Sequence, residues 1–121
     1  MAKAKYVFLA MGDCSDPARE ADLNKWWDEI HIPDILLSPE AIQGFRYVNT
    51  DPDGNKRPKY LEIIEVETDD IVKFEKELDA RMAKLRSEGR GMSCLMPDRS
   101  VPLKRPYYKQ LSSIKKATKK T

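Results

Sequence analysis

The sequence has few of the residues that mark the commoner kinds of chemical site. It contains one histidine, two cysteines and five glycines in 121 residues. Cys14 and Cys94 have no CxxC spacing and no histidine nearby, so neither a zinc site nor a disulfide framework is indicated. The glycines form neither GxGxxG nor GxxxxGKS/T, which argues against a nucleotide-binding loop. We therefore expect neither a metal ion nor a cofactor.

Long hydrophobic runs and a strong net charge are also missing. No apolar run approaches the roughly 18 residues that a membrane-spanning helix needs, and the first residues lack a convincing cleavage region. We expect a cytoplasmic protein with no membrane partner. The net charge of +2 is too small to indicate nucleic-acid binding. The charges are uneven, however, because residues 13–34 carry seven acidic and two basic residues, whereas residues 90–121 carry nine basic and one acidic. The acidic helix and the basic end could meet within one fold or across a dimer.

What is present fits one globular domain. With 121 residues, of which 40% are hydrophobic, the chain is long enough to bury a core without disulfides. Residues 114–121 are rich in lysine and have no apolar face of any size, so we expect them to form a flexible tail. The predicted domain is therefore residues 1–113, followed by the tail 114–121.

Three stretches favour β-strands clearly and a fourth does so weakly. Apolar, β-forming residues run over 6–11, 42–49 and 59–66. The turn-forming residues 50–58 lie between the last two, which predicts an antiparallel hairpin with a long, exposed loop. Residues 92–96 could form a short strand or a covering loop, and 106–111 is the best candidate for the last strand.

The first helix is expected over residues 17–30. Ser15 or Asp16 is a candidate N-cap. Pro33 disfavours helical geometry in the residue before it, which places His31 at the C-terminal edge of this helix. The apolar side chains follow the i, i+3, i+4 spacing of one helix face. Those expected to hold the helix on the sheet are Leu23, Trp26 and Ile30.

A second helix follows residues 68–70, where Thr68, Asp69 and Asp70 can cap its first turn. An apolar stripe then continues until Gly89 ends the helix. Its members are Ile71, Phe74, Leu78, Met82 and Leu85.

The resulting order, β-α-β-β-α-β, predicts an α+β fold of ferredoxin-like arrangement, an antiparallel sheet with both helices on one face. The strands carry apolar residues at both alternating positions, as in Val7, Phe8 and Leu9 of the first strand. Both faces of the sheet therefore require burial, and helices on one side can cover only one of them. We expect a homodimer that packs sheet against sheet.

A family resemblance is carried by two motifs. They are Asn24-x-Trp26-Trp27-Asp28-x-x-His31-x-Pro33-Asp34 and, after it, Gly44-Phe45-x-x-Val48. The chain resembles EthD-like small proteins of the dimeric α+β barrel superfamily, with their N-x-W-[YW]-D-x-x-H-x-P-D signature, over roughly residues 5–112. The resemblance implies a dimeric barrel without cofactor. Relatives include decarboxylases, dehydratases, polyketide cyclases, lactone isomerases and monooxygenases.

His31 is the candidate catalytic residue, because an unperturbed histidine titrates at about pH 6.5 and can exchange a proton near neutrality. Asp28 lies three residues earlier and is expected to orient the imidazole, with Asp34 as a second candidate partner. Asn24 or Tyr47 could donate a hydrogen bond to an enolate or carbonyl oxygen of the substrate.

The pocket is expected between the first helix and the sheet, and its aromatic walls suit a planar compound. The sequence thus predicts a cofactor-independent lyase or isomerase for a small, hydrophobic aromatic or polyketide-like carbonyl compound. The alternatives are a non-catalytic dimer that binds a small ligand and a cofactor-free monooxygenase. A purely structural role is also open, since a histidine at a helix C-terminus is favoured by the helix dipole. The expected wall residues are Phe8, Trp27, Phe45 and Tyr60.

Overall fold

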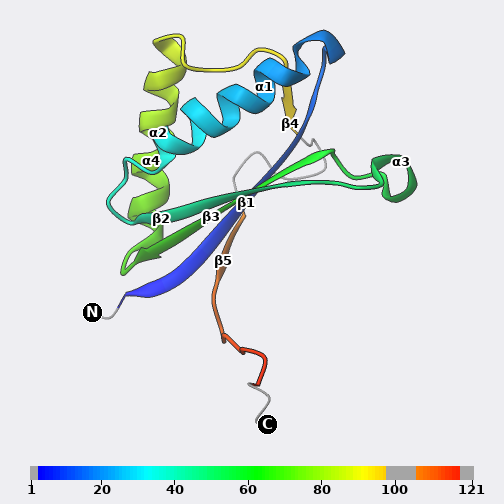
Figure 1. The fold of residues 1–121 in the computed structure, drawn as a ribbon. Coiled ribbons are helices and arrows are strands. Elements are labelled where there is room, and N and C mark those ends of the chain that lie inside the picture. Colours follow the sequence, from blue (N-terminus) through cyan, green and yellow to red (C-terminus); the bar gives the residue numbers. More distant parts are fainter. Residues whose placement is uncertain (1–2, 98–105, 118–121) are drawn as a thin grey trace.

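The computed structural model describes residues 3–97 and 106–117. It is an α+β fold in which a curled antiparallel sheet carries its helices on one face (Figure 1). The strand order is β2-β3-β1-β4, and β5 also pairs with β1. The predicted α+β class and antiparallel sheet are therefore confirmed. The strands are β1 (Ala4–Cys14), β2 (Ala41–Val48), β3 (Tyr60–Thr68), β4 (Leu95–Pro97) and β5 (Tyr107–Lys109).

The sheet contains the predicted hairpin, and its last strand differs from the prediction. β1 lies antiparallel to β3, from Ala4 opposite Thr68 to Gly12 opposite Tyr60. β2 and β3 form the expected hairpin, with the short helix α3 (Pro52–Asn55) in the connecting loop. The last strand is split, because β4 and β5 pair with opposite ends of β1.

The first helical segment is longer than expected. It runs through η1 (Pro17–Arg19), α1 (Glu20–Trp26), the π-helical turn η2 (Trp27–His31) and α2 (Ile32–Ile35). In η2 the Ile32 N–H donates to the Trp27 carbonyl, five residues earlier. This wider turn places Pro33 at the start of α2, where its missing N–H is tolerated. The expectation that His31 ends the helix is therefore wrong, because the π-helical turn accommodates the proline.

The second long helix, α4 (Ile71–Ser87), confirms the sequence signals at both ends. The Asp70 carboxylate accepts a hydrogen bond of 3.0 Å from the Lys73 N–H in the first turn. Gly89, with φ of +83°, takes the left-handed conformation just beyond the last turn. Phe74, Leu78 and Met82 of the predicted stripe are buried.

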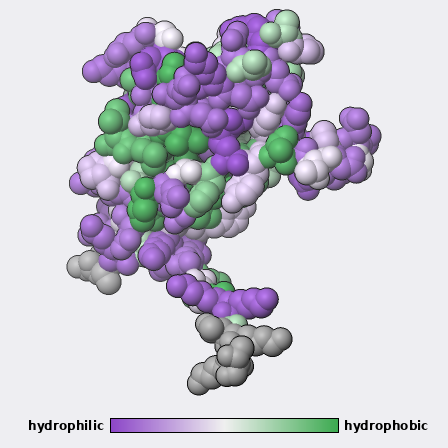
Figure 2. Space-filling view, viewed as in Figure 1, coloured by the Kyte–Doolittle hydropathy of each residue, from purple (hydrophilic) through white to green (hydrophobic). Residues whose placement is uncertain are grey.

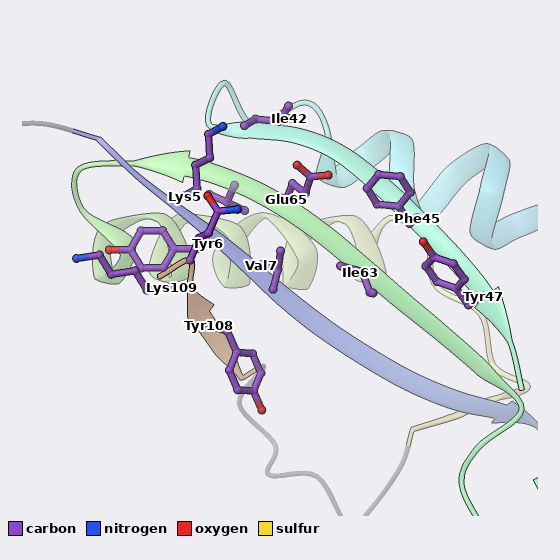
Figure 3. Close-up of a pocket in the computed structure, with 12 residues that line it drawn as sticks. Lys5, Tyr6, Val7, Ile42, Phe45, Tyr47, Ile63, Glu65, Tyr108 and Lys109 are labelled. Carbon is purple, nitrogen blue, oxygen red and sulfur yellow. The ribbon is translucent and has the colours of Figure 1, made fainter. Parts of the chain in front are cut away.

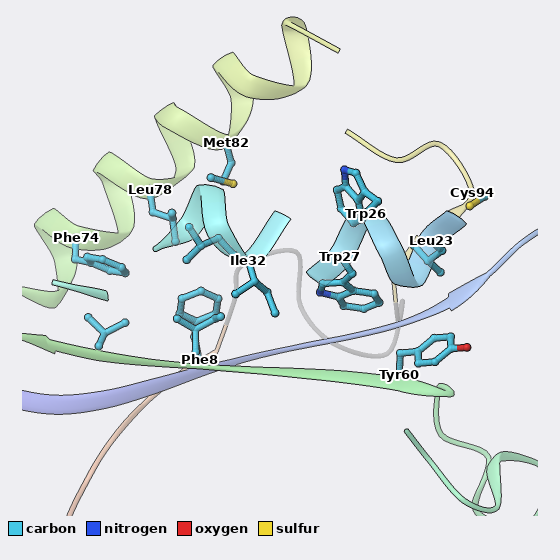
Figure 4. Close-up of a cluster of buried hydrophobic side chains, with 13 residues drawn as sticks. Phe8, Leu23, Trp26, Trp27, Ile32, Tyr60, Phe74, Leu78, Met82 and Cys94 are labelled. Carbon is cyan, nitrogen blue, oxygen red and sulfur yellow. The ribbon is translucent and has the colours of Figure 1, made fainter. Parts of the chain in front are cut away.

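The core lies between the helices and the sheet (Figure 4). Alternate residues of β3 are buried against the helices, from Tyr60 to Thr68. Leu23 is fully buried, as expected. Trp26, in contrast, points away from the sheet, and Trp27 lies over it (Figure 4). The tryptophan that holds this segment on the sheet is therefore Trp27, because Trp26 turns to the chain beyond α4, where its Nε1 donates to the Arg90 carbonyl.

Gly44 marks the closest approach between helix and sheet. A Cβ atom at this position would lie 2.8 Å from Ile32 Cγ2 and 3.0 Å from Ile64 Cδ1. The absence of a side chain lets α2 rest directly on β2. A register shift between Ala41 and Gln43 lies beside it.

The other face of the sheet carries no helix among the described residues. Its side chains include Val7, Phe45 and Ile63, which alternate with the core positions. Residues 110–117 leave the body beyond β5 and are exposed (Figure 1). They are largely hydrophilic in Figure 2, in which hydrophobic side chains gather in the middle of the body. The predicted tail, 114–121, is described only to residue 117. Within the described ranges, no helix is both long and apolar enough to cross a bilayer.

Candidate functional site at His31

His31 lies between a stacked indole and a buried carboxylate. Its ring stacks on Trp26, with 4.7 Å between the ring centroids and 20° between the planes. Its Nε2 lies 3.6 Å from Glu62 Oε1. The same oxygen accepts a 2.9 Å hydrogen bond from Trp27 Nε1. The Glu62 side chain is only 1% exposed, whereas that of His31 is 24% exposed. The imidazole is thus fixed on two sides and still reaches the surface.

Glu62 is the main residue that sequence reasoning missed. It lies on β3 at the same alternation as Tyr60, Ile64 and Val66, all of which are buried. This alternation is the feature of the sequence that could have identified Glu62 as buried, because side chains two residues apart on a strand share a face. Burying a carboxylate is costly unless polar partners compensate it. Trp27 Nε1 and His31 Nε2 are polar groups of this kind beside the Glu62 carboxylate.

Asp28 and Asn24 gather around Arg46 of β2. Arg46 Nη1 donates to Asp28 Oδ1 at 3.1 Å, and its Nη2 donates to Asn24 Oδ1 at 2.7 Å. Asn24 Nδ2 in turn donates to the Tyr60 hydroxyl at 3.1 Å. The expectation that Asp28 pairs with His31 is wrong. The carboxylate beside His31 is that of Glu62, and Asp28 pairs with Arg46. The cause is η2, since residues three apart do not share a face in a π-helical turn as they do in an α-helix.

Asp34 also pairs with a residue other than His31. Its two carboxylate oxygens accept hydrogen bonds of 2.8 and 2.9 Å from Nε and Nη2 of Arg90. This bidentate contact with Asp34 raises the pKa of Arg90. Asp34 is 7% exposed. It therefore anchors the chain beyond α4 to α2, close to His31.

A cavity of about 160 Å³ adjoins His31 and opens between α2 and the end of α4. An apolar protein cavity of roughly 150 Å³ is known to hold benzene, so this space suits a single ring. It is smaller than the roughly 300–1,000 Å³ of typical drug-sized sites. Its lining consists of Trp26, His31, Asp34, Met82, Leu85, Arg86, Arg90, Gly91, Met92 and Leu95.

A larger groove, of about 430 Å³, lies on the opposite face of the sheet (Figure 3). Phe45 and Tyr47 line it, beside Val7, Ile63 and Tyr108. The expected single pocket is thus divided, and the sheet separates both residues from His31. Strand alternation explains this, because Arg46 faces the helices and its neighbours must face away.

The remaining expected wall residues belong to the core. Phe8 is 0% exposed and Trp27 is 2% exposed, and neither lines the two hollows described above. Tyr60 is buried beside Trp27, with 6.2 Å between the ring centroids. Trp27 bonds to Glu62 and Tyr60 to Asn24, whereas Phe8 packs in the core beside Tyr107, and none of the three lines either hollow.

Other reactive groups are few. Among the described residues, no group of three or more His, Cys, Asp or Glu side chains could hold a metal ion. Both cysteines are free thiols. Burial raises the pKa of the Cys94 thiol, which makes it a poor nucleophile.

Comparisons with models of known families, with curated proteins and with solved structures gave no match. The resemblance to EthD-like proteins therefore stays a prediction from the motif.

Proposed function

We propose that this protein is a cofactor-independent isomerase or lyase that acts on a small cyclic carbonyl compound by acid/base catalysis at His31. The observation that carries the proposal is the placement of His31 between Trp26 and Glu62 at the wall of a cavity. The cavity volume of about 160 Å³ favours a single-ring compound over a polyketide.

The chemistry requires only proton transfers. His31 takes a proton from a carbon next to the carbonyl group, and the electron pair moves to the carbonyl oxygen as an enolate. Returning the proton to a different carbon gives an isomer. Protonating a neighbouring hydroxyl group instead releases water and gives the dehydrated product. The Glu62 carboxylate, 3.6 Å from His31 Nε2, stabilises the imidazolium that exists between the two transfers.

His31→Gln is the direct test. We expect loss of turnover of single-ring carbonyl compounds by at least 100-fold, since positioned acid/base groups contribute about 10²–10⁴. The unfolding midpoint should stay close to that of the unaltered protein, because the imidazole is partly exposed. Products are identified by mass, where a loss of water indicates dehydration and no change indicates isomerisation. Unchanged turnover in the variant would refute the proposal.

A non-catalytic ligand-binding dimer is the second candidate, and the groove on the open face favours it. At about 430 Å³ it is the larger hollow, and it has aromatic walls without His31. A ligand bound there would depend on Tyr47 or Tyr108 and would be unaffected by His31→Gln. Oxygen consumption during turnover would instead indicate the monooxygenase.

We also propose that the chain adopts the ferredoxin-like arrangement and forms a homodimer through this open face. The strand order β2-β3-β1-β4, with α1 and α4 on one face, supports the arrangement. The open face is apolar in its middle, and its groove is bordered by Lys5, Lys109 and Glu65 (Figure 3). A surface that carries both signs of charge can match a copy of itself across a two-fold axis.

A further inference from the structure

The walls of the cavity at His31 differ in chemistry. One part is apolar, formed by Trp26, Met82, Leu85, Met92 and Leu95. The other carries two guanidinium groups, Arg86 in the last turn of α4 and Arg90 just beyond it. Such a division suits a molecule with an apolar ring and a negatively charged group.

Among the described residues, Arg90 at this mouth has acidic partners and the Arg86 guanidinium has none. Asp34 is the only acidic residue in the lining, and Arg90 already binds both of its oxygens. Glu88 acts on Arg90 through space. Within the part of the chain that the structure describes, the Arg86 guanidinium has no hydrogen bond or ion pair. The Arg86 guanidinium group is therefore available to bind an anionic group of a ligand beside the apolar wall.

The position of Arg86 is supported by its surroundings. The stem of Arg86 packs on the following loop, where a Cβ at Gly91 would lie 3.4 Å from Arg86 Cγ. That loop is fixed in turn by the Trp26 Nε1 bond to the Arg90 carbonyl and by the Arg90 bonds to Asp34. Arg90 is thus held at a set place relative to the Trp26 indole, on which His31 stacks, and the stem of Arg86 lies against the same loop.

We propose that the compound bound at His31 carries a carboxylate, and that Arg86 holds this group at the cavity mouth while the ring lies against Trp26. The planar guanidinium matches a carboxylate in shape and charge. Arg90 lines the same mouth and adds positive potential. This assignment rests on the proposed function and narrows its substrates to single-ring carboxylates. It also disfavours decarboxylation, because an arginine that pairs with the carboxylate stabilises the group that would have to leave.

Benzoate is the probe, with benzamide as a neutral control of the same shape. Binding is measured by calorimetry and by the shift of the His31 ring protons in NMR spectra, which are easily assigned because the chain has a single histidine. We expect benzoate to shift these signals and to bind at least tenfold more tightly than benzamide, since hydrogen bonds to charged groups contribute strongly to affinity.

Arg86→Gln should weaken benzoate binding about tenfold and leave benzamide binding unchanged. Arg86→Lys should restore part of the affinity, because it keeps the charge. Lys84→Gln removes the same charge from the same helix outside the lining and should have no effect. Because the Arg86 side chain is exposed and makes no bond to another described residue, these variants should fold normally.

Equal binding of benzoate and benzamide, an unshifted His31 signal, or an Arg86→Gln variant that binds benzoate normally would each overturn the inference. Failure of the proposed function would give a different experimental result. If benzoate binding requires Arg86 but His31→Gln leaves turnover intact, the carboxylate site stands and the acid/base role falls. If a neutral compound is turned over through His31 without any effect of Arg86→Gln, the reverse holds.

Discussion

At the scale of single residues, Glu62 has the most influence on the candidate site. Its carboxylate meets both the Trp27 indole N–H and the imidazole of His31 in the core. The first contact is structural, because it satisfies a buried donor. The second affects the charge of the imidazole. Substitutions that separate these two contacts can therefore separate stability from activity.

Glu62→Gln keeps an oxygen that accepts from Trp27 and removes the negative charge beside His31. We expect the fold to persist and turnover to fall on the order of 100-fold. The titration midpoint of the single histidine, followed by NMR, should move to lower pH, because the positive form loses its anionic neighbour. An unchanged midpoint would mean that Glu62 has only a packing role.

Gly44→Ala tests the contact between α2 and β2. The added methyl group would lie 2.8 Å from Ile32 Cγ2, so either the helix or the strand must move. We expect destabilisation of about 1–3 kcal/mol in chemical denaturation. Gly91→Ala is the control, because its nearest neighbour is at 3.4 Å and belongs to a flexible arginine. Equal stability of the two variants would contradict the packing described.

At the scale of elements, the helical segment 17–35 determines which side chains meet. Its caps and apolar spacing are local signals, and they predict a start after Ser15 or Asp16, of which Asp16 is the N-cap, and the burial of Leu23. The π-helical turn has no such signal, since its stability depends on contacts with β2 and β3. One extra residue in a turn was enough to exchange Asp28 for Glu62 as the neighbour of His31.

An ion pair joins the start of α1 to Lys59, the residue before β3, and gives a pH-dependent prediction. Lys59 Nζ lies 2.6 Å from Glu20 Oε2, and this hydrogen bond, with a further one from Tyr60, lowers the pKa of Glu20 below its ordinary 4.5. A carboxylate with a lowered pKa stabilises the fold above its unfolded value and loses this contribution as the pH falls through its folded value.

Glu20→Gln should therefore lower the thermal midpoint near pH 6, and the difference from the unaltered protein should shrink as the pH falls below about 4. Glu29→Gln removes an equal charge from the same segment. The Glu29 carboxylate makes no bond to another described side chain, so this variant should show no such trend. A difference for Glu20→Gln that is constant with pH would exclude the ion pair as its cause.

At the scale of the whole molecule, the proposed homodimer can be tested at the open face of the sheet. Ile63→Glu places a charge in the middle of this face and should convert a dimer into monomers in sedimentation experiments. Leu37→Glu alters a side chain that is 68% exposed in the turn after α2, and should leave assembly unchanged. If the unaltered protein sediments as a monomer, the proposed dimer is wrong.

The same scale explains why the sequence predicts the fold better than the site. Strand alternation and helix periodicity act over a few residues, so the first three strands and the two longest helical segments follow from them, whereas η2, α2 and α3 do not. The lining of the pocket depends on which face of the sheet each side chain occupies. Phe45 and Tyr47 were expected beside His31, although they alternate with Gly44 and Arg46, which face the helices. The same alternation places Phe45 and Tyr47 on the open face of the sheet.

The π-helical turn η2 also constrains how this sequence can change in length. Deleting one residue, such as Glu29, would close the wide turn into ordinary α-helical bonding, because a π-helical turn holds one residue more than an α-helical turn. Pro33 would then lie in the interior of an α-helix, where its ring clashes with the carbonyl group four residues earlier. We therefore expect homologous chains that keep Pro33 to keep the spacing between Asn24 and His31 without a gap.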